Sequence, residues 1–241
     1  MPARTTTRNP AILSYHVLRR LVGIFALSLP FVLPAGAILL ALAGPAHALP
    51  RPLVERAISD YYYTPMSSVY AGSLWVIAMF LICSRGYDRH DEIAGYLAGA
   101  FTLGVALFPA EKPRSAHYTR LQINIGFAHT AFAGLMFLSI AYFCLFLFRR
   151  SSPERKPTRR KRHRNAIYAV CGVVIIACMC GMVILTMKGL VEAPGSRHAF
   201  FCCESLALIA FGVAWLTKGE GILRDPPHER NHTLTDTAML H

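Results

Sequence analysis

Two ionisable side chains lie inside long apolar runs of this sequence, where such groups are rare. His129 falls nine residues after Arg120, and Glu204 falls six residues after His198. At a rise of 1.5 Å per helical residue, these offsets correspond to depths of about 13 Å and about 9 Å below the polar rim. An ionisable group in a membrane span is costly unless it is paired or hydrated, so it marks a candidate functional site. The matched depths predict a polar pocket that both side chains share.

Three further polar side chains lie at the same rim. Asp60 precedes the second apolar run, His117 lies before the fourth, and Gln122 is seven residues before His129, on the same helical face. We expect the set to bind a lipid headgroup or a small ligand. The alternative is structural: His129 would then be neutral and hydrogen-bonded to a backbone carbonyl, and Glu204 would be protonated or paired with an arginine. The candidate ligand-binding residues are Asp60, His117, Gln122, His129 and Glu204.

Four of these residues, Asp60, His117, His129 and Glu204, are of types that bind zinc. They are scattered along the chain, without an H-x-x-x-H or H-E-x-x-H pair, so their spacing does not support a metal centre and no cofactor is assigned. A metal held here would lower the pKa of water to about 7, as an intramembrane lipid hydrolase requires. A non-catalytic structural or partner-docking protein is the other alternative. No residue is assigned a catalytic role.

Six apolar runs must position these side chains. Each is interpreted as a transmembrane helix, because lipid offers backbone groups no other hydrogen-bonding partner. The sequence therefore predicts an all-α, polytopic transmembrane bundle over residues 21–217, between an N-terminal segment 1–20 and a cytoplasmic tail 218–241 that we expect to be largely disordered. Ala46-His-Ala48 resembles a signal-peptide cleavage site, but the preceding run is long and contains prolines, so we expect a retained helix. The runs are Leu21–Leu42, Ser67–Ser84, Ile93–Pro109, Leu121–Phe148, Ala166–Met187 and Ala199–Thr217.

Composition and charge agree with a membrane protein. Hydrophobic residues make up 54% of the chain and charged residues 16%, which is too apolar for an ordinary soluble domain. Eighteen of the 25 lysines and arginines flank the runs on the side of the two termini, so the positive-inside rule predicts cytoplasmic termini, in a bacterial inner membrane. The net charge of +12 lies mainly in these loops, which argues against a nucleic-acid partner. The basic loop 149–165 is expected to attract anionic lipid.

The stretch "ISDYYYTPM" (Ile58–Met66) joins the first two runs. Thr64-Pro65 has the pattern of a helix start, with a hydroxyl at the N-cap and proline at the first helical position. Tyr61, Tyr62 and Tyr63 are then expected just outside the helix at headgroup depth, where tyrosine is enriched. Asp60 is the residue of this stretch that we expect to face a site.

Five segments carry a resemblance to known proteins: "ISDYYYTPM", "FLICSRGYDRHDEIAGYLAGAFTLGVALFP", "AHTAFAGLMFLSIAYFCLFLFRR", "RNAIYAVCGVVI" and "ESLALIAFGVAWLTKGEGILRD". In these segments the chain resembles a family of uncharacterised bacterial multi-pass inner-membrane proteins. The resemblance implies a membrane bundle and places the family pattern on Ser59, Asp60, Tyr61, His129, Glu204 and Ser205, without implying a reaction. A more distant similarity, in "ISD…P" alone, is to eukaryotic multi-pass proteins of lipid and autophagy pathways.

Overall fold

The regular structure of the protein is helical throughout the part that a computed structural model describes. That part comprises residues 10–44, 52–84, 88–111, 119–150, 159–191, 193 and 197–219, with side chains described from residue 17 onward, except at residue 197. Five of the six predicted apolar runs each fall mainly on one α-helix, and the run Leu121–Phe148 falls on an α-helix that continues into a π-helical turn, which confirms the all-α class for the described residues. The elements are α1 (Pro10–Ala43), the 3-10 turn η1 (Ser59–Tyr63), α2 (Ser67–Cys83), α3 (Arg89–Leu107), α4 (Arg120–Tyr142), the π-helical turn η2 (Phe143–Leu147), α5 (Arg159–Met187) and α6 (Arg197–Lys218).

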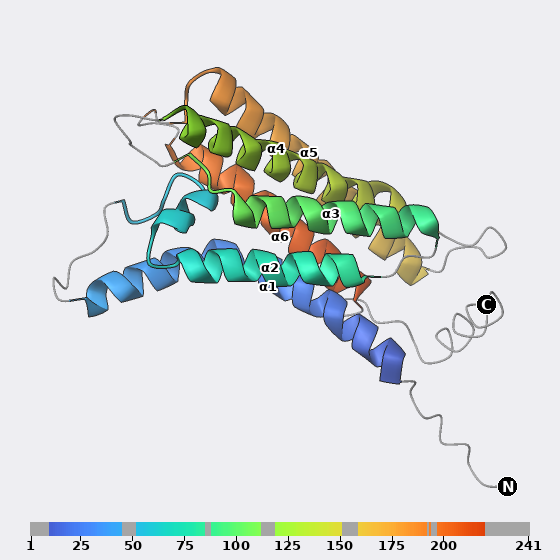
Figure 1. Ribbon diagram of the computed structural model, residues 1–241. Coiled ribbons are helices and arrows are strands. Elements are labelled where there is room, and N and C mark those ends of the chain that lie inside the picture. The colour runs from blue at the N-terminus through green and yellow to red at the C-terminus, as the bar shows by residue number, and fades with distance from the viewer. Residues whose placement is uncertain are drawn as a thin grey trace, which may run out of the picture.

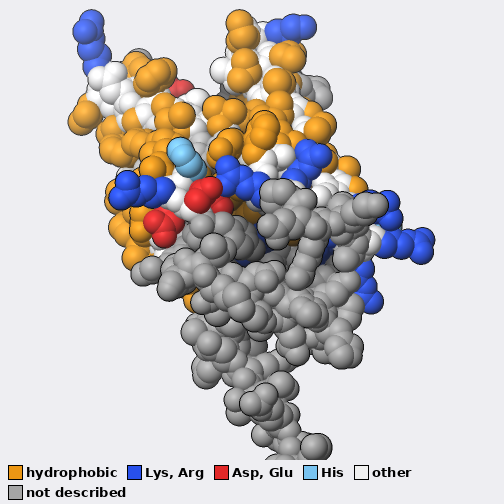
Figure 2. All heavy atoms as spheres, turned by 90° about the vertical axis from the view of Figure 1, so that its right-hand side faces the viewer, with side chains coloured by type: hydrophobic (Ala, Val, Ile, Leu, Met, Phe, Trp, Pro, Cys, Tyr) orange, Lys and Arg blue, Asp and Glu red, His pale blue; other side chains and the backbone are white. Residues whose placement is uncertain are grey.

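The helices lie alongside one another, and the chain alternates between two ends of the bundle (Figure 1). One end, called here the η1 end, holds η1, the last turn of α3 and the first turns of α2, α4 and α6. The opposite end holds the first residues of α1 and α5 and the last residues of α6. We call it the basic end, because lysine and arginine side chains gather on it (Figure 2).

Four helices are long and apolar enough to cross a membrane. They are Val17–Ala43 within α1, Arg120–Leu147 across α4 and η2, Arg159–Met187 and His198–Lys218. The apolar helix α2 is shorter, with 17 residues. This set is compatible with an integral membrane protein. Six spans and cytoplasmic termini stay predictions, and the predicted disordered tail from residue 220 lies outside the described residues.

The first and last helices cross at a pair of glycines. A Cβ atom added to Gly212 of α6 would lie 2.7 Å from the carbonyl oxygen of Gly23 and 2.8 Å from Leu27 Cβ. One added to Gly23 of α1 would lie 2.9 Å from both Gly212 O and Leu216 N. The contacts with Gly23 O, Gly212 O and Leu216 N are with backbone atoms, which cannot move aside as a flexible side chain can. The two glycines therefore allow α1 and α6 to approach at backbone distance, as small residues do in membrane helix pairs.

Glycines also set how α3 packs on its neighbours. Gly99 lies against α2, where an added Cβ would fall 2.9 Å from the carbonyl oxygen of Ala78. Gly104 lies against α4, where a Cβ would overlap the ring of Phe132. That ring stacks on Phe108 with centroids 5.5 Å apart. The tight α3–α4 contact is therefore in the half of α3 near the η1 end.

The π-helical turn η2 directs the end of α4 into an aromatic cluster. Phe143 and Phe148 both contact the indole of Trp215 edge-on, with centroid separations of 5.4 and 4.7 Å. Phe211 contacts the same ring at 4.7 Å. A π turn holds one more residue than an α turn and so rotates the residues that follow it. The turn thereby places Phe148 on the buried face, where it is 4% exposed.

Beyond η2, Arg150 ties the end of α4 to the start of α3. Its Nη1 atom donates to Asp88 Oδ2 at 2.8 Å and to Asp91 Oδ1 at 3.0 Å. Asp88 is the N-cap of α3 and accepts the backbone N–H of Asp91 at 2.9 Å. The pKa of Asp88 is lowered below its ordinary value of 3.8. The main cause is the hydrogen bond from the Asp91 N–H, and the Arg150 guanidinium contributes less.

Acid is expected to weaken this tie. Because the pKa of Asp88 is lower in the folded protein than in the unfolded chain, its stabilising effect is complete above the unfolded pKa and disappears as pH falls through the folded pKa. In the variant Asp88→Asn, the amide side chain would still cap the helix but would not titrate. Between pH 6 and pH 3, the melting temperature in detergent should therefore fall less for this variant than for the unaltered protein. Equal falls would show that the carboxylate contributes nothing to the pH dependence.

Candidate functional site

The connection before α2 folds onto the η1 end of the bundle. Its backbone turns through η1, and Tyr61 at the centre of the turn is 0% exposed, while Tyr63 is 40% exposed. Tyr61 therefore packs in the core of the bundle, and the headgroup depth expected for the three tyrosines stays a prediction. Its hydroxyl accepts the backbone N–H of Glu55 at 3.4 Å, and burial raises the pKa of Tyr61 above its ordinary value.

The predicted helix start at Thr64-Pro65 is also displaced. The helix α2 begins at Ser67, with Met66 in the N-cap position. Thr64 instead closes η1, because its N–H and its hydroxyl both donate to the carbonyl oxygen of Tyr61, at 3.2 and 2.8 Å. The hydroxyl also accepts the N–H of Met66 at 3.2 Å. Pro65 therefore lies in the turn between η1 and α2, and not in the first turn of α2.

Asp60 is buried in an ion pair. Its side chain is 1% exposed and accepts from Arg56 Nε at 2.7 Å. Arg56 in turn donates from Nη2 to the carbonyl oxygen of Glu111, just past the end of α3, at 3.1 Å. A second bond to this region runs from the Tyr63 hydroxyl to the carbonyl oxygen of Ala110 at 2.6 Å. The residue that the sequence singled out in this stretch thus helps to hold η1 against α3.

Glu204 of α6 holds the same turn from the other side. Its Oε2 accepts the backbone N–H of Ile58 at 2.7 Å, across 146 residues of sequence. The backbone of Ser59 also hydrogen-bonds this carboxylate. A carboxylate that accepts N–H groups at the start of a helical turn satisfies donors without an intrahelical partner. We call the contacts of Glu204 with Ile58 and Ser59 the η1 latch.

Buried polarity extends from the latch toward α2. Tyr70 is 3% exposed and lies within electrostatic reach of both Glu204 and Asp60. Ser205, next to Glu204 and 8% exposed, has a buried hydroxyl oxygen without a hydrogen-bond partner among the described residues. The structure thus brings two of the sequence-predicted residues, Asp60 and Glu204, to the same turn.

His129 and Gln122 have other partners. His129 is 5% exposed, and its Nδ1 lies 2.7 Å from the carbonyl oxygen of Phe108. Since a carbonyl oxygen can only accept, Nδ1 carries a proton and donates it to this bond. Gln122 is exposed and forms a capping box with Thr119 at the start of α4. His117 lies outside the described residues. The common ligand pocket of these residues stays a prediction, and each described member has an intramolecular contact that accounts for its position.

No group of three or more histidine, cysteine, aspartate or glutamate side chains within the described ranges is arranged to hold a metal ion. The zinc alternative named His117, which those ranges do not include, so that proposed ligand set is only partly described. Of the other three residues, Asp60 is paired with Arg56, His129 with Phe108 and Glu204 with Ile58.

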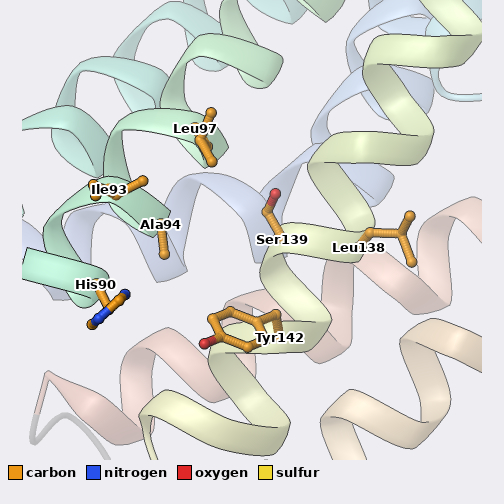
Figure 3. A pocket seen from close by; sticks show the side chains of 7 residues that line it. All are labelled: His90, Ile93, Ala94, Leu97, Leu138, Ser139 and Tyr142. Carbon is orange, nitrogen blue, oxygen red and sulfur yellow. The ribbon is translucent and has the colours of Figure 1, made fainter.

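A groove that the sequence did not indicate lies between α3 and α4, toward the basic end. Its volume is about 350 Å³, at the lower end of the range for small-molecule sites. Figure 3 shows Ser139 and Tyr142 on the side of α4 toward α3, whereas the side chain of Leu138 extends away from α3. The lining residues are His90, Ile93, Ala94 and Leu97 of α3 and Leu138, Ser139 and Tyr142 of α4.

The groove changes character along its length. Leu97 and Leu138 make its deeper part apolar, and they are 47% and 49% exposed. His90, in the first turn of α3, and Tyr142, in the last turn of α4, make its other part polar. Seven residues separate His90 from Leu97, so the gradient extends over about 10 Å at the helical rise. In sequence, only the i, i+3, i+4, i+7 spacing of His90, Ile93, Ala94 and Leu97 marks this face.

Comparison with known proteins finds no matching family model, no matching curated protein and no matching solved structure.

Proposed function

We propose that this chain is an integral membrane protein that binds a phospholipid, with an acyl chain in the groove between α3 and α4. The supporting observation is the amphipathic gradient of the groove, which passes from two exposed leucines to a histidine and a tyrosine hydroxyl at the helix ends. A lipid has the same gradient, from hydrocarbon to headgroup. This proposal keeps the ligand class predicted from the sequence and moves the site from the η1 end to the other half of the bundle.

The arrangement of α3 and α4 gives a physical reason for lipid to occupy the groove. The helices are in close contact at Gly104 and Phe132, and the groove lies beyond this contact toward the basic end. The small side chains Ala94 and Ser139 leave the space between them open. An acyl chain in this space would restore the dispersion contacts that unfilled volume lacks. The hydroxyl of Ser139 already donates to the carbonyl oxygen of Leu135 at 2.8 Å, so it does not need a hydrogen-bond acceptor on the lipid.

A groove-filling substitution should test this proposal. In Ser139→Phe, a ring would occupy the space assigned to the acyl chain. With a phosphatidylcholine that carries a diazirine in its acyl chain, photo-adducts on residues 90–97 and 138–142 should fall about fivefold, equivalent to about 1 kcal/mol of binding free energy. The adducts would be mapped by mass spectrometry of peptides after reconstitution in vesicles.

The matched control is Ala131→Phe, which adds the same ring to an exposed position of α4 outside the groove. This variant should keep the unaltered pattern of adducts, and both variants should keep the melting temperature of the parent protein to within a few degrees. Equal labelling of the groove peptides in both variants would contradict the proposal. So would labelling spread evenly over every exposed helical face.

A further inference from the structure

The helices α3 and α4 are joined beyond both ends of the groove between them. Toward the η1 end, Gly104 lies against the ring of Phe132. Toward the basic end, Arg150 Nη1 donates to Asp88 Oδ2 at 2.8 Å and to Asp91 Oδ1 at 3.0 Å. The lining side chains between these two contacts are exposed or half-buried. A ligand is therefore expected to enter the groove from the side and to lie along the two helices.

Two polar side chains near the basic end of the groove have hydrogen-bonding groups left for a ligand. They are His90, in the first turn of α3, and Tyr142, in the last turn of α4. Neither the imidazole nor the phenol hydroxyl makes a hydrogen bond to another residue in the described part of the chain. In Figure 3 the ring of Tyr142 extends from α4 toward the side on which His90 lies. The hydroxyl of Ser139 differs, because it already donates to the carbonyl oxygen of Leu135.

The two free groups can both donate a hydrogen bond. A phenol donates its O–H, and an imidazole has an N–H to donate whether or not the ring is charged. Hydrogen bonds from such donors are stronger when the acceptor is ionised, as the oxygens of a phosphodiester are. The ester carbonyls of a lipid without phosphate are neutral acceptors and gain less. This end of the groove therefore suits a phosphate group.

The lining gives no basis for selecting the rest of the headgroup by its charge. No lysine, arginine, aspartate or glutamate is among the described residues that line the groove. The nearby guanidinium of Arg150 is held between the carboxylates of Asp88 and Asp91. A fixed positive charge would favour an anionic headgroup, and a fixed negative charge would favour an amine. With neither in the lining, the phosphate is the group that the protein can recognise.

We propose that His90 and Tyr142 bind the phosphodiester of the phospholipid whose acyl chain occupies the groove. The inference rests on the proposed function and specifies the ligand further. The headgroup lies toward the basic end, and the protein recognises the phosphate that glycerophospholipids share. Phosphatidylcholine, phosphatidylethanolamine and phosphatidylglycerol therefore bind with similar affinity. Diacylglycerol has the same acyl chains without the phosphate and binds at least about tenfold more weakly.

The hydroxyl of Tyr142 can be removed without its ring. In Tyr142→Phe the ring remains and keeps its contact with Phe146, whose centroid is 5.3 Å away. The full chain in vesicles would be photolabelled with phosphatidylcholine or diacylglycerol that carries the same diazirine acyl chain, and adducts on residues 90–97 and 138–142 would be mapped. Labelling by phosphatidylcholine should fall about fivefold in this variant, and labelling by diacylglycerol should not change. The matched control is Tyr96→Phe, which removes a hydroxyl from an exposed position of α3 outside the groove.

The imidazole of His90 is tested in the same way. His90→Leu should lower labelling by phosphatidylcholine about fivefold, whereas His90→Gln keeps an N–H donor and should retain most of it. The melting temperature of each variant checks its fold. A large excess of inorganic phosphate should leave the labelling unchanged. If inorganic phosphate abolishes it, the two donors bind a free phosphate ion and the lipid source is overturned.

The remaining outcomes separate this inference from the proposed function. If phosphatidylcholine and diacylglycerol label the groove equally and Tyr142→Phe changes neither, the phosphate contact is overturned while the acyl-chain groove stands. If neither lipid labels the groove, the proposed function fails and the inference fails with it. An equal fall in Tyr142→Phe and Tyr96→Phe would also overturn the contact. So would a preference of more than about tenfold among the three phospholipid headgroups.

Discussion

Replacing Gly212 by valine is expected to destabilise the bundle strongly, because it forces α1 and α6 apart. A Cβ at this position would lie 2.7 Å from Gly23 O and 2.8 Å from Leu27 Cβ, and valine adds two methyl groups beyond it. Since the closest contact is backbone, the two helices must separate along their whole crossing. Overpacking commonly costs 1–3 kcal/mol, and we expect about 3 kcal/mol here. The measurement is the midpoint of unfolding in a mixed-detergent titration.

The control for this prediction is Gly134→Ala. Gly134 lies in the middle of α4, and an added Cβ would have no atom within 4 Å among the described residues. Without a steric cost, the substitution should stabilise the helix by about 0.5–1 kcal/mol, since glycine loses more backbone entropy on folding than alanine. A Gly212→Val protein as stable as the parent would show that α1 and α6 do not cross at these glycines.

Removing the carboxylate of Glu204 is expected to release η1 from the bundle. In Glu204→Ala, the N–H of Ile58 loses its acceptor while Ile58 itself is 1% exposed. A buried donor without a partner costs about 1–3 kcal/mol. We expect a loss of about 2 kcal/mol in the free energy of unfolding, because the variant also removes a half-buried ionisable group from α6, whose burial is itself unfavourable. The turn around Ser59 should then open about thirtyfold more often, at 1.4 kcal/mol per factor of ten.

Opening of the turn can be measured at one residue. Ser59 is 7% exposed, so Ser59→Cys is shielded from a membrane-impermeant maleimide while the η1 latch holds. The modified site is identified by peptide mapping, because native cysteines such as Cys202 are also exposed. Glu204→Gln keeps an acceptor oxygen and should open much less than the alanine variant. If the alanine variant reacts at the parent rate, the latch does not hold the turn.

The helices could be predicted from sequence because each buries an apolar run that lipid or a neighbouring helix must cover. Their ends were less predictable. The run that begins at Ala166 belongs to a helix that starts at Arg159, since arginine and lysine are good helix formers and extend α5 beyond its apolar part. The start of α1 at Pro10, before the apolar run at Leu21, is a similar extension, and proline suits the first helical position.

The polar residues themselves could be found from sequence, but most of their partners could not. The charge of Glu204 in an apolar run was visible, whereas its acceptance of the Ile58 N–H depends on how a loop 146 residues away folds. The Arg56–Asp60 pair could have been found, because the two residues are four apart and oppositely charged. The carbonyl that His129 contacts becomes available because α3 ends at Leu107, one residue before Phe108.

The groove depends on the angle between two helices rather than on the identity of any residue. Gly104 and Phe132 bring α3 and α4 into contact in one half of their length, and the space in the other half follows from the geometry of that contact. A pattern of apolar residues specifies which face of a helix is covered, but not where along its length a neighbouring helix diverges. The seven lining residues therefore looked like ordinary membrane-facing positions.

The pairing of α1 with α6 has a consequence for biosynthesis. In the membrane bundle that we propose, the helices would be inserted from the N-terminus onward, and Gly23 leaves the ribosome 189 residues before the Gly212 that it contacts. Ile58 likewise precedes its acceptor by 146 residues. Until translation reaches α6, the first helix lacks its contact with Gly212 and the connection after it lacks the Glu204 acceptor, and only then does the ring of helices close. A stalled or truncated chain that ends before α6 would therefore be a good substrate for membrane quality-control proteases.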